Sequence, residues 1–179
     1  MRTFALTLLL SIAPSFAADI YSFGLIPADG NIQGTPGSTI GWGYTIENQS
    51  STLWLVTTAL DSGVFQHGSP SVVFDFPDLA PGETVTVAFD AVLFAGLQSL
   101  LWDASAPIGF INSGNFILSA EWWDGDPFDQ GAFQSGAPSQ SVPYTASVSA
   151  SAVPEPATGA IAALGLAAFG ITALRRRRA

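Results

Sequence analysis

Ser38-Thr39-Ile40-Gly41-Trp42-Gly43-Tyr44-Thr45-Ile46 is the stretch of sequence that decides the fold. Large apolar residues alternate in it with glycine and threonine, so that one face carries Ile40, Trp42, Tyr44 and Ile46. Successive side chains of a β-strand point to opposite faces of the sheet, and this period of two therefore predicts a strand with one buried face. The polar residues 47–51 that follow are typical of a turn.

The same alternation recurs along most of the chain between its two ends. About seven short runs with turn residues between them predict an all-β fold, an antiparallel β-sandwich. A first strand is also expected within residues 19–25, and residues 91–102 are ambiguous between strand and helix. The expected inward faces are Trp54, Val56 and Leu60; Val72, Phe74 and Phe76; Val85, Val87 and Phe89; Phe116, Leu118, Ala120 and Trp122; and Val142, Tyr144, Ala146 and Val148.

The first 17 residues have the layout of a secretory signal peptide. A short positive start containing Arg2 precedes an apolar run, and small residues then stand at the positions that signal peptidase reads. Cleavage is expected after Ala17; cleavage after Ala18 is the alternative, although it would put Phe16 at a small-residue position. The other interpretation is an uncleaved membrane anchor, for which the apolar run is short.

The other end of the chain combines an apolar segment with a basic cluster. Residues 157–174 carry no charge, and as a helix they would be roughly 27 Å long, enough to cross the hydrocarbon core. By the positive-inside rule the basic cluster stays in the cytoplasm and everything upstream lies outside. The members of this cluster are Arg175, Arg176, Arg177 and Arg178.

Pro154, Glu155 and Pro156 stand directly before this transmembrane segment. The three parts together resemble the PEP-CTERM sorting signal over residues 153–179. The resemblance implies recognition by an exosortase, a transient anchor in the inner membrane, cleavage near Pro-Glu-Pro, and release to the cell surface or extracellular matrix. It also implies bacteria that make exopolysaccharide for a biofilm, which makes exopolysaccharide a candidate partner. A permanent tail anchor with a chance Pro-Glu-Pro is the alternative.

A second resemblance concerns the domain between the two tails. Residues 41–46 with Asn48, followed by Leu79-Ala80-Pro81-Gly82-Glu83-Thr84-Val85, are similar to immunoglobulin-like domains of bacterial surface proteins. This similarity implies an immunoglobulin-like sandwich. The expected organisation is a signal peptide at 1–17, a β-sandwich at 18–146, a linker at 147–153 and the sorting signal at 154–179.

The domain between the tails contains no basic side chain. All five Lys and Arg residues lie in the tails, and of the 14 acidic residues only Glu155 lies outside residues 18–152, which leaves 13 in the domain. Nucleic acid is therefore not an expected partner, because no cation is available to neutralise phosphate. Salt or divalent cations should relieve the self-repulsion of so many carboxylates.

Residue types that most catalytic sites need are missing from the sequence. The chain has no Cys and a single histidine, His67, so neither a zinc site nor a cysteine nucleophile can be built. No nucleophile-elbow motif is present either. We therefore expect a non-enzymatic structural or adhesive protein. A hydrolase that uses two carboxylates remains the catalytic alternative.

The segment 121–131 is the main candidate for a ligand-binding site. Asp124, Asp126 and Asp129, assisted by Glu121, offer hard oxygen ligands to Ca²⁺, the one cofactor that the residues suggest. The spacing is not that of an EF-hand. The alternative is an exposed acidic hairpin loop in which Asp and Gly serve turn geometry.

Trp122 and Trp123 are adjacent in this same segment. In a strand they would point to opposite faces, so one of them is expected in the core. The other side chain would stand beside the acidic loop. Trp123 is therefore a candidate platform on which a sugar ring of a glycan could stack.

Overall fold

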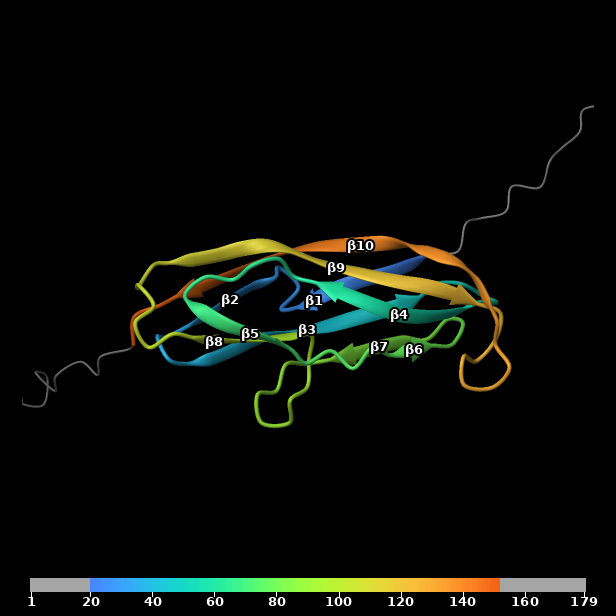
Figure 1. Cartoon of the computed structure of the whole chain (residues 1–179), viewed down its shortest axis with the longest axis horizontal. Coiled ribbons are helices and arrows are strands. Elements are labelled where there is room, and N and C mark those ends of the chain that lie inside the picture. The colour runs from blue at the N-terminus through green and yellow to red at the C-terminus, as the bar shows by residue number, and fades with distance from the viewer. Residues whose placement is uncertain (1–19, 152–179) are drawn as a thin grey trace, which may run out of the picture. The chain divides into compact units, whose positions relative to one another are not determined.

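The computed structural model describes residues 20–151, which form ten β-strands and, within that range, no helix that could span a membrane. The strands make two five-stranded sheets that lie one above the other (Figure 1), and the expected all-β fold is confirmed. The predicted signal peptide and sorting signal lie outside the described residues. The strands are β1 (Tyr21–Ile26), β2 (Asn31–Gly34), β3 (Thr39–Asn48), β4 (Trp54–Asp61), β5 (Gly68–Val72), β6 (Asp78–Leu79), β7 (Thr84–Val87), β8 (Gln98–Trp102), β9 (Ile111–Trp123) and β10 (Phe133–Val148).

One sheet has the order β1-β3-β8-β5, with β7 also paired to β3, and the other has the order β2-β10-β9-β4-β6. All pairs of these strands are antiparallel except β2 with β10, which run parallel from Asn31 opposite Thr145 to Gly34 opposite Val148. The expectation of a purely antiparallel sandwich is therefore wrong at this edge. Since β9 occupies one side of β10, β2 pairs with β10 on its other side, at the edge of the sheet.

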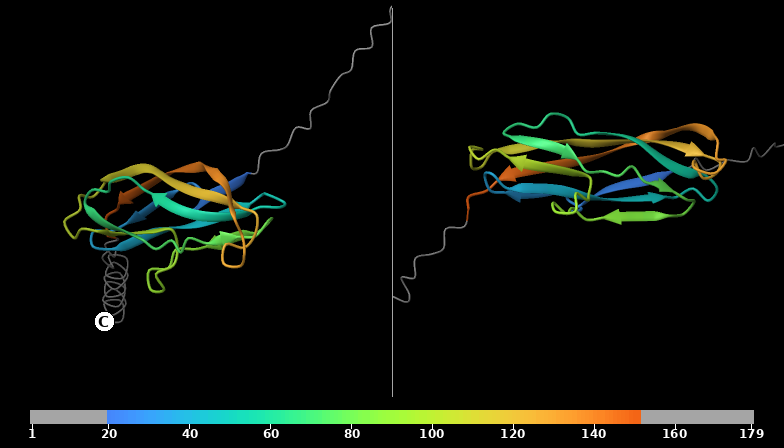
Figure 2. Two further views of the ribbon diagram at one scale, coloured as in Figure 1. Left: turned by 45° about the vertical axis from the view of Figure 1, so that its right-hand side comes forward. Right: turned by 60° about the horizontal axis from the view of Figure 1, so that its bottom comes forward.

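The hydrophobic core lies between the two sheets, which face each other in both views of Figure 2. The ring of Trp42 on β3 packs edge-on against Phe116 on β9, with 5.1 Å between the ring centroids. The inward faces predicted for β3, β9 and β10 are confirmed. Fully buried members of these three faces include Trp42, Tyr44, Ile46, Phe116, Leu118 and Ala146.

The inward face predicted for β4 is wrong. The buried residues of β4 are Leu55 and Thr57, whereas the predicted ones, Trp54, Val56 and Leu60, are only half-buried. Periodicity cannot choose between the two faces here, because residues 54–56 are all apolar. The core accepts Thr57 because its hydroxyl donates a hydrogen bond to the carbonyl oxygen of Pro77 at 2.9 Å.

The predicted face of Val72, Phe74 and Phe76 is also wrong, since only Phe74 is buried. Strand β5 ends at Val72, and Phe76 has a positive φ of 52°, which breaks the alternation of an extended chain. The ring of Phe74 packs edge-on against Tyr44, with 4.8 Å between the centroids. Phe74 is therefore the buried aromatic residue that anchors the connection between β5 and β6.

Two glycines of β3 make room for another part of the chain. β7 and β8 share the edge of β3 opposite β1, and residues 88–97, here named the crossing loop, connect them. A Cβ atom at Gly43 would overlap the carbonyl oxygen of Val87, and one at Gly41 would overlap the ring of Phe89. The loop therefore passes over the outer face of β3. Phe89 was predicted to face the core, but it lies on this outer face instead.

The end of the domain differs slightly from the expected boundary. Strand β10 continues to Val148, two residues into the segment 147–153 that was expected to be a linker, and Val148 is buried. Ser149 follows, and its N–H donates to the carbonyl oxygen of Gly34 at 2.8 Å. Small and polar residues can close a strand as well as form a linker, because the parallel pairing with β2 satisfies their backbone groups.

Candidate functional site

The candidate segment 121–131 forms the end of β9 and most of the loop that leads to β10. Asp124 closes the base of this loop: its N–H donates to the carbonyl oxygen of Ala132 at 3.1 Å, and its Oδ1 accepts the N–H of Ala132 at 2.7 Å. Its Oδ2 accepts a hydrogen bond from Nε2 of Gln134 at 2.8 Å. Both carboxylate oxygens of Asp124 thus join the two ends of the hairpin.

Asp126 shapes the tip of the same loop. Its Oδ1 accepts the N–H of Phe128 at 2.9 Å, and its carbonyl oxygen accepts the N–H groups of Asp129 at 3.0 Å and Gly131 at 2.9 Å. A side chain that bonds to the backbone two residues ahead is the usual contribution of aspartate to a turn. These contacts are the ones expected of turn formation, the alternative to calcium binding.

The four predicted calcium ligands do not gather in one cluster. Within residues 20–151, no group of three or more His, Asp or Glu side chains is placed to hold a metal ion. The side chain of Glu121 instead bonds to the residue two positions further along β9, since its Oε2 accepts the Nε1–H of Trp123 at 3.2 Å. Calcium binding by Glu121, Asp124, Asp126 and Asp129 remains a prediction from the sequence.

The two adjacent tryptophans point in opposite directions, as expected. Trp122 is buried and packs edge-on against Tyr21 of the facing sheet, at a centroid distance of 6.2 Å. Trp123 is half-buried on the other face, where its ring meets Phe133 edge-on at 6.4 Å. The structure therefore leaves Trp123 on the outer surface beside the acidic loop, and its use for glycan stacking remains a prediction.

Asp78 was not among the predicted site residues, although it lies near this loop. Strand β4 brings the two together, because its Val56 is paired with Asp78 on one side and with Glu121 on the other. Burial and, to a smaller extent, the negative charge of Asp126 raise the pKa of Asp78 above its usual range. No local motif marks this proximity, which depends on the order of strands in the sheet.

Replacing Asp78 by Asn should stabilise the protein at neutral pH but not in acid. Because the pKa of Asp78 is raised in the folded state, its ionised form disfavours folding once the pH exceeds the ordinary value of 3.8. Melting temperatures should therefore be higher for Asp78→Asn than for wild type at about pH 7 and equal at about pH 3. Asp129→Asn removes one charge from the exposed part of the loop, and an equal gain from this control would mean that only net charge matters.

The same melting experiment with added calcium chloride tests the calcium prediction. A cation that binds only the folded state raises the melting temperature. The rise should be absent when Asp124, Asp126 and Asp129 are all replaced by Asn. If the triple variant responds as the wild type does, this loop is not the calcium site.

His67 lies outside the candidate loop, just before β5. Its ring packs edge-on against Phe110 with 4.5 Å between the centroids, and its carbonyl oxygen accepts the N–H of Asp103 at 3.0 Å. Its φ of 54° is positive, and the chain bends at this residue before β5 begins. These contacts give His67 a structural place in the connection between β4 and β5.

The end of the chain, beyond the described domain, carries a recognisable signal. Residues 152–178 match the PEP-CTERM protein-sorting motif. The match includes all the residues predicted for sorting, from Pro154, Glu155 and Pro156 to the cluster 175–178. The PEP-CTERM motif indicates an extracellular protein that is processed by an exosortase. No curated protein and no solved structure matches the chain significantly.

Proposed function

We propose that this protein is exported, anchored transiently in the inner membrane through residues 157–174, and released by an exosortase to the cell surface or extracellular matrix. Signal peptidase would act first, after Ala17 or Ala18. The released β-domain would then serve as a structural or adhesive component without catalysis. The observation that carries this proposal is the match of residues 152–178 to the PEP-CTERM motif.

The strand order supports an immunoglobulin-like identity for the released domain. Immunoglobulin sandwiches have one sheet of strands A-B-E-D and another that contains C-F-G. If β2, β6 and β7 are taken as additions, the remaining strands in chain order give A-B-E-D as β1-β3-β8-β5 and C-F-G as β4-β9-β10. Domains with this architecture gather their loops at the two ends of the sandwich, and in variable domains the loops of one end bind the ligand, which suits a surface component.

The charge and the side-chain contacts of the domain support a non-catalytic role. Its carboxylates include several that serve its own structure, such as Glu83, whose Oε2 accepts the N–H of Ala80 at 2.8 Å, and Asp29, which binds Asn31. His67 packs against an aromatic ring. A domain of this charge would remain soluble and would not bind nucleic acid.

The intact mass of the protein from separate membrane and surface fractions tests this proposal. We expect a mass that begins near Ala18 and ends near Glu155, found outside the inner membrane. Trypsin cannot map these ends from within the domain, because residues 18–152 contain no Lys or Arg. A wild-type protein that retains Arg178 and stays in the inner membrane would refute exosortase processing.

A triple variant that replaces Pro154, Glu155 and Pro156 by Ala should keep the full C-terminus and remain in the inner membrane. Ser151→Ala, just before the matched motif, is the control and should be processed like the wild type. Normal processing of the triple variant would mean that the anchor is cut by another protease that does not read Pro-Glu-Pro.

A ligand-binding module at residues 121–129 is the second candidate function. The aromatic surface beside the acidic loop supports it: Phe133 is 54% exposed next to Trp123, and Phe128 at the tip is 91% exposed. Such exposed rings suit the apolar face of a sugar, and the acidic loop suits calcium. Unaltered glycan binding by a Trp123→Ala variant would count against this site.

A further inference from the structure

A groove lies on the outer face of the sheet, on the side of β3, β8 and β5 that faces away from the core. Its volume is about 440 Å³, within the range of small-ligand sites. Ser99 and Leu101 of β8 form its floor, whereas Leu100 between them is fully buried on the core side. This outer groove belongs neither to the loop 121–131 nor to the sorting motif.

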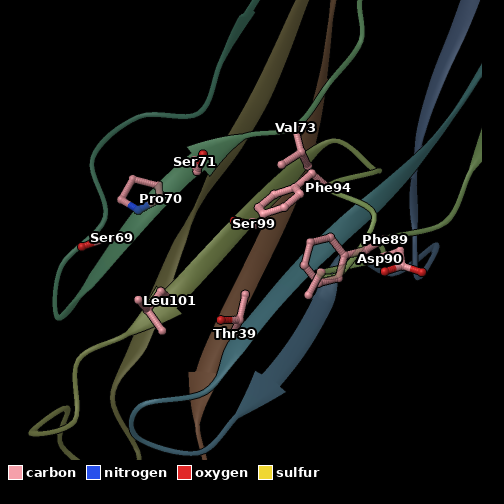
Figure 3. A pocket seen from close by; sticks show the side chains of 11 residues that line it. Thr39, Ser69, Pro70, Ser71, Val73, Phe89, Asp90, Phe94, Ser99 and Leu101 are labelled. Atoms are coloured by element: carbon pink, nitrogen blue, oxygen red, sulfur yellow. The ribbon is translucent and has the colours of Figure 1, made fainter.

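Four hydroxyl groups line the outer groove, from three different strands. No side-chain hydrogen bond links any of them to another residue of the described range 20–151, so they are free to bond to a ligand. Figure 3 shows them spread around the groove rather than gathered at one point. They belong to Thr39 of β3, Ser69 and Ser71 of β5, and Ser99 of β8.

The crossing loop supplies the aromatic side of the groove. Phe89 and Phe94 line it, and Figure 3 shows both rings across from Ser69, Pro70 and Ser71. The side chain of Phe94 is 77% exposed and its φ is 53°. A bulky residue rarely adopts a positive φ, and such outliers are concentrated at functional sites.

The crossing loop is held firmly in this conformation, as its hydrogen bonds show. Oδ1 of Asp90 accepts the N–H groups of Val92 at 2.8 Å and Leu93 at 3.0 Å. The backbones of Asp90 and Ala95 also exchange two hydrogen bonds, of 2.9 and 3.1 Å. The loop, which stands away from the sheet in Figure 1, therefore places the ring of Phe94 at the groove without needing a ligand.

We propose that the outer groove binds an uncharged glycan chain. A pyranose ring presents hydroxyls at its rim and C–H groups on its faces, and these match the four free hydroxyls and the two phenyl rings. Charge excludes the acidic alternatives, because Asp90 lines the groove and residues 18–152 contain no basic side chain. An aspartate is ionised at neutral pH, and the two backbone amides that bind Asp90 lower its pKa further.

A peptide is a poorer match for the same surface. Peptides usually join an exposed sheet edge by pairing with its backbone. The edge strand here is β5, and Pro70 in its middle has no N–H to donate. Glycan binding does not need that edge, since it uses side chains on the face of the sheet. It also does not depend on exosortase processing, so the two proposals can fail separately.

Native gel electrophoresis in gels containing a soluble polysaccharide tests the proposal with the full chain, purified in a detergent without a sugar head group. The probes are hydroxyethyl cellulose, dextran and galactomannan, which are uncharged, and carboxymethyl cellulose, which has the cellulose backbone with added carboxylates. At least one neutral polymer should slow the protein, and carboxymethyl cellulose should not. Failure of all three neutral polymers would overturn the proposal.

Variants locate the binding site in the same gels. Phe94→Ala should weaken retardation about tenfold, in line with the loss of one well-placed aromatic contact, and Ser99→Ala should weaken it by a smaller factor. Leu93→Ala is the matched control, because Leu93 is 76% exposed on the same loop but does not line the groove. Two results would place binding elsewhere and overturn the proposal. One is retardation that survives Phe94→Ala. The other is a loss of retardation in Leu93→Ala or Trp123→Ala that equals the loss in Phe94→Ala.

Discussion

Replacing Trp42 by Ala should lower the free energy of unfolding by about 3–5 kcal/mol, the usual cost of removing a large buried aromatic side chain. Trp42 is 0% exposed and contacts two rings of the facing sheet, with centroid distances of 5.1 Å to Phe116 and to Tyr144. Its Nε1 also donates to the carbonyl oxygen of Gly30 at 2.8 Å. The variant therefore loses packing and one buried hydrogen bond, whereas the carbonyl oxygen of Gly30 keeps the N–H of Thr145 at 3.0 Å. Urea unfolding measures the combined loss.

Two further variants separate these contributions. Trp42→Phe keeps an aromatic ring but cannot bond to Gly30, so its loss should be smaller than that of Trp42→Ala. Trp123→Ala is the matched control, because Trp123 is half-buried on the outer face. An equal loss from Trp42→Ala and Trp123→Ala would contradict a core centred on Trp42.

Asn48→Ala should cost about 3 kcal/mol, because a buried side chain that bonds four backbone groups is lost at once. Asn48 is 0% exposed, and its Nδ2 donates to the carbonyl oxygens of Leu53 at 2.8 Å, Ala80 at 3.0 Å and Leu79 at 3.1 Å. Its Oδ1 accepts the N–H of Ser50 at 3.0 Å. Asn48 thus ties the turn after β3 to the end of β6 in the other sheet.

Asn48→Asp tests the donor role of this side chain with almost no change in shape. A carboxylate would face three carbonyl oxygens, so we expect a loss at neutral pH at least as large as that of Asn48→Ala. Asn115→Ala, at an exposed position of β9, is the control and should change stability by no more than about 0.5 kcal/mol. If both Asn48 variants unfold like the wild type, the buried hydrogen bonds contribute little.

Local alternation in the sequence predicted several strands correctly, and the successes share a cause. In residues 40–46 all the large apolar side chains occupy one face, and in residues 116–122 all of them do except Ile117. Turning such a strand over would expose all of them, so one orientation is strongly preferred. In β4 the apolar residues lie on both faces, and the prediction failed because burial of either face seemed equally favourable.

The candidate site shows the same division between local and long-range information. Asp124 and Asp126 bond within their own loop, and the sequence indicated both the loop and its turn-forming alternative. The proximity of Asp78 to Asp126 depends on β6 joining the edge of β4. The outer groove likewise combines residues of three strands and the crossing loop, and no stretch of sequence contains them together.

The sequence by itself determined the all-β class, the buried faces of β3 and β9, the acidity of the domain and the sorting motif at its end. Each of these depends on residue type and short-range spacing, which the chain carries in any conformation. Tertiary structure alone decided the parallel pairing of β2, the place of Phe89 over Gly41, and the groove beside the crossing loop. These features arise when the chain must satisfy backbone hydrogen bonds and fill space with distant partners, and the energies of such contacts depend on the whole arrangement.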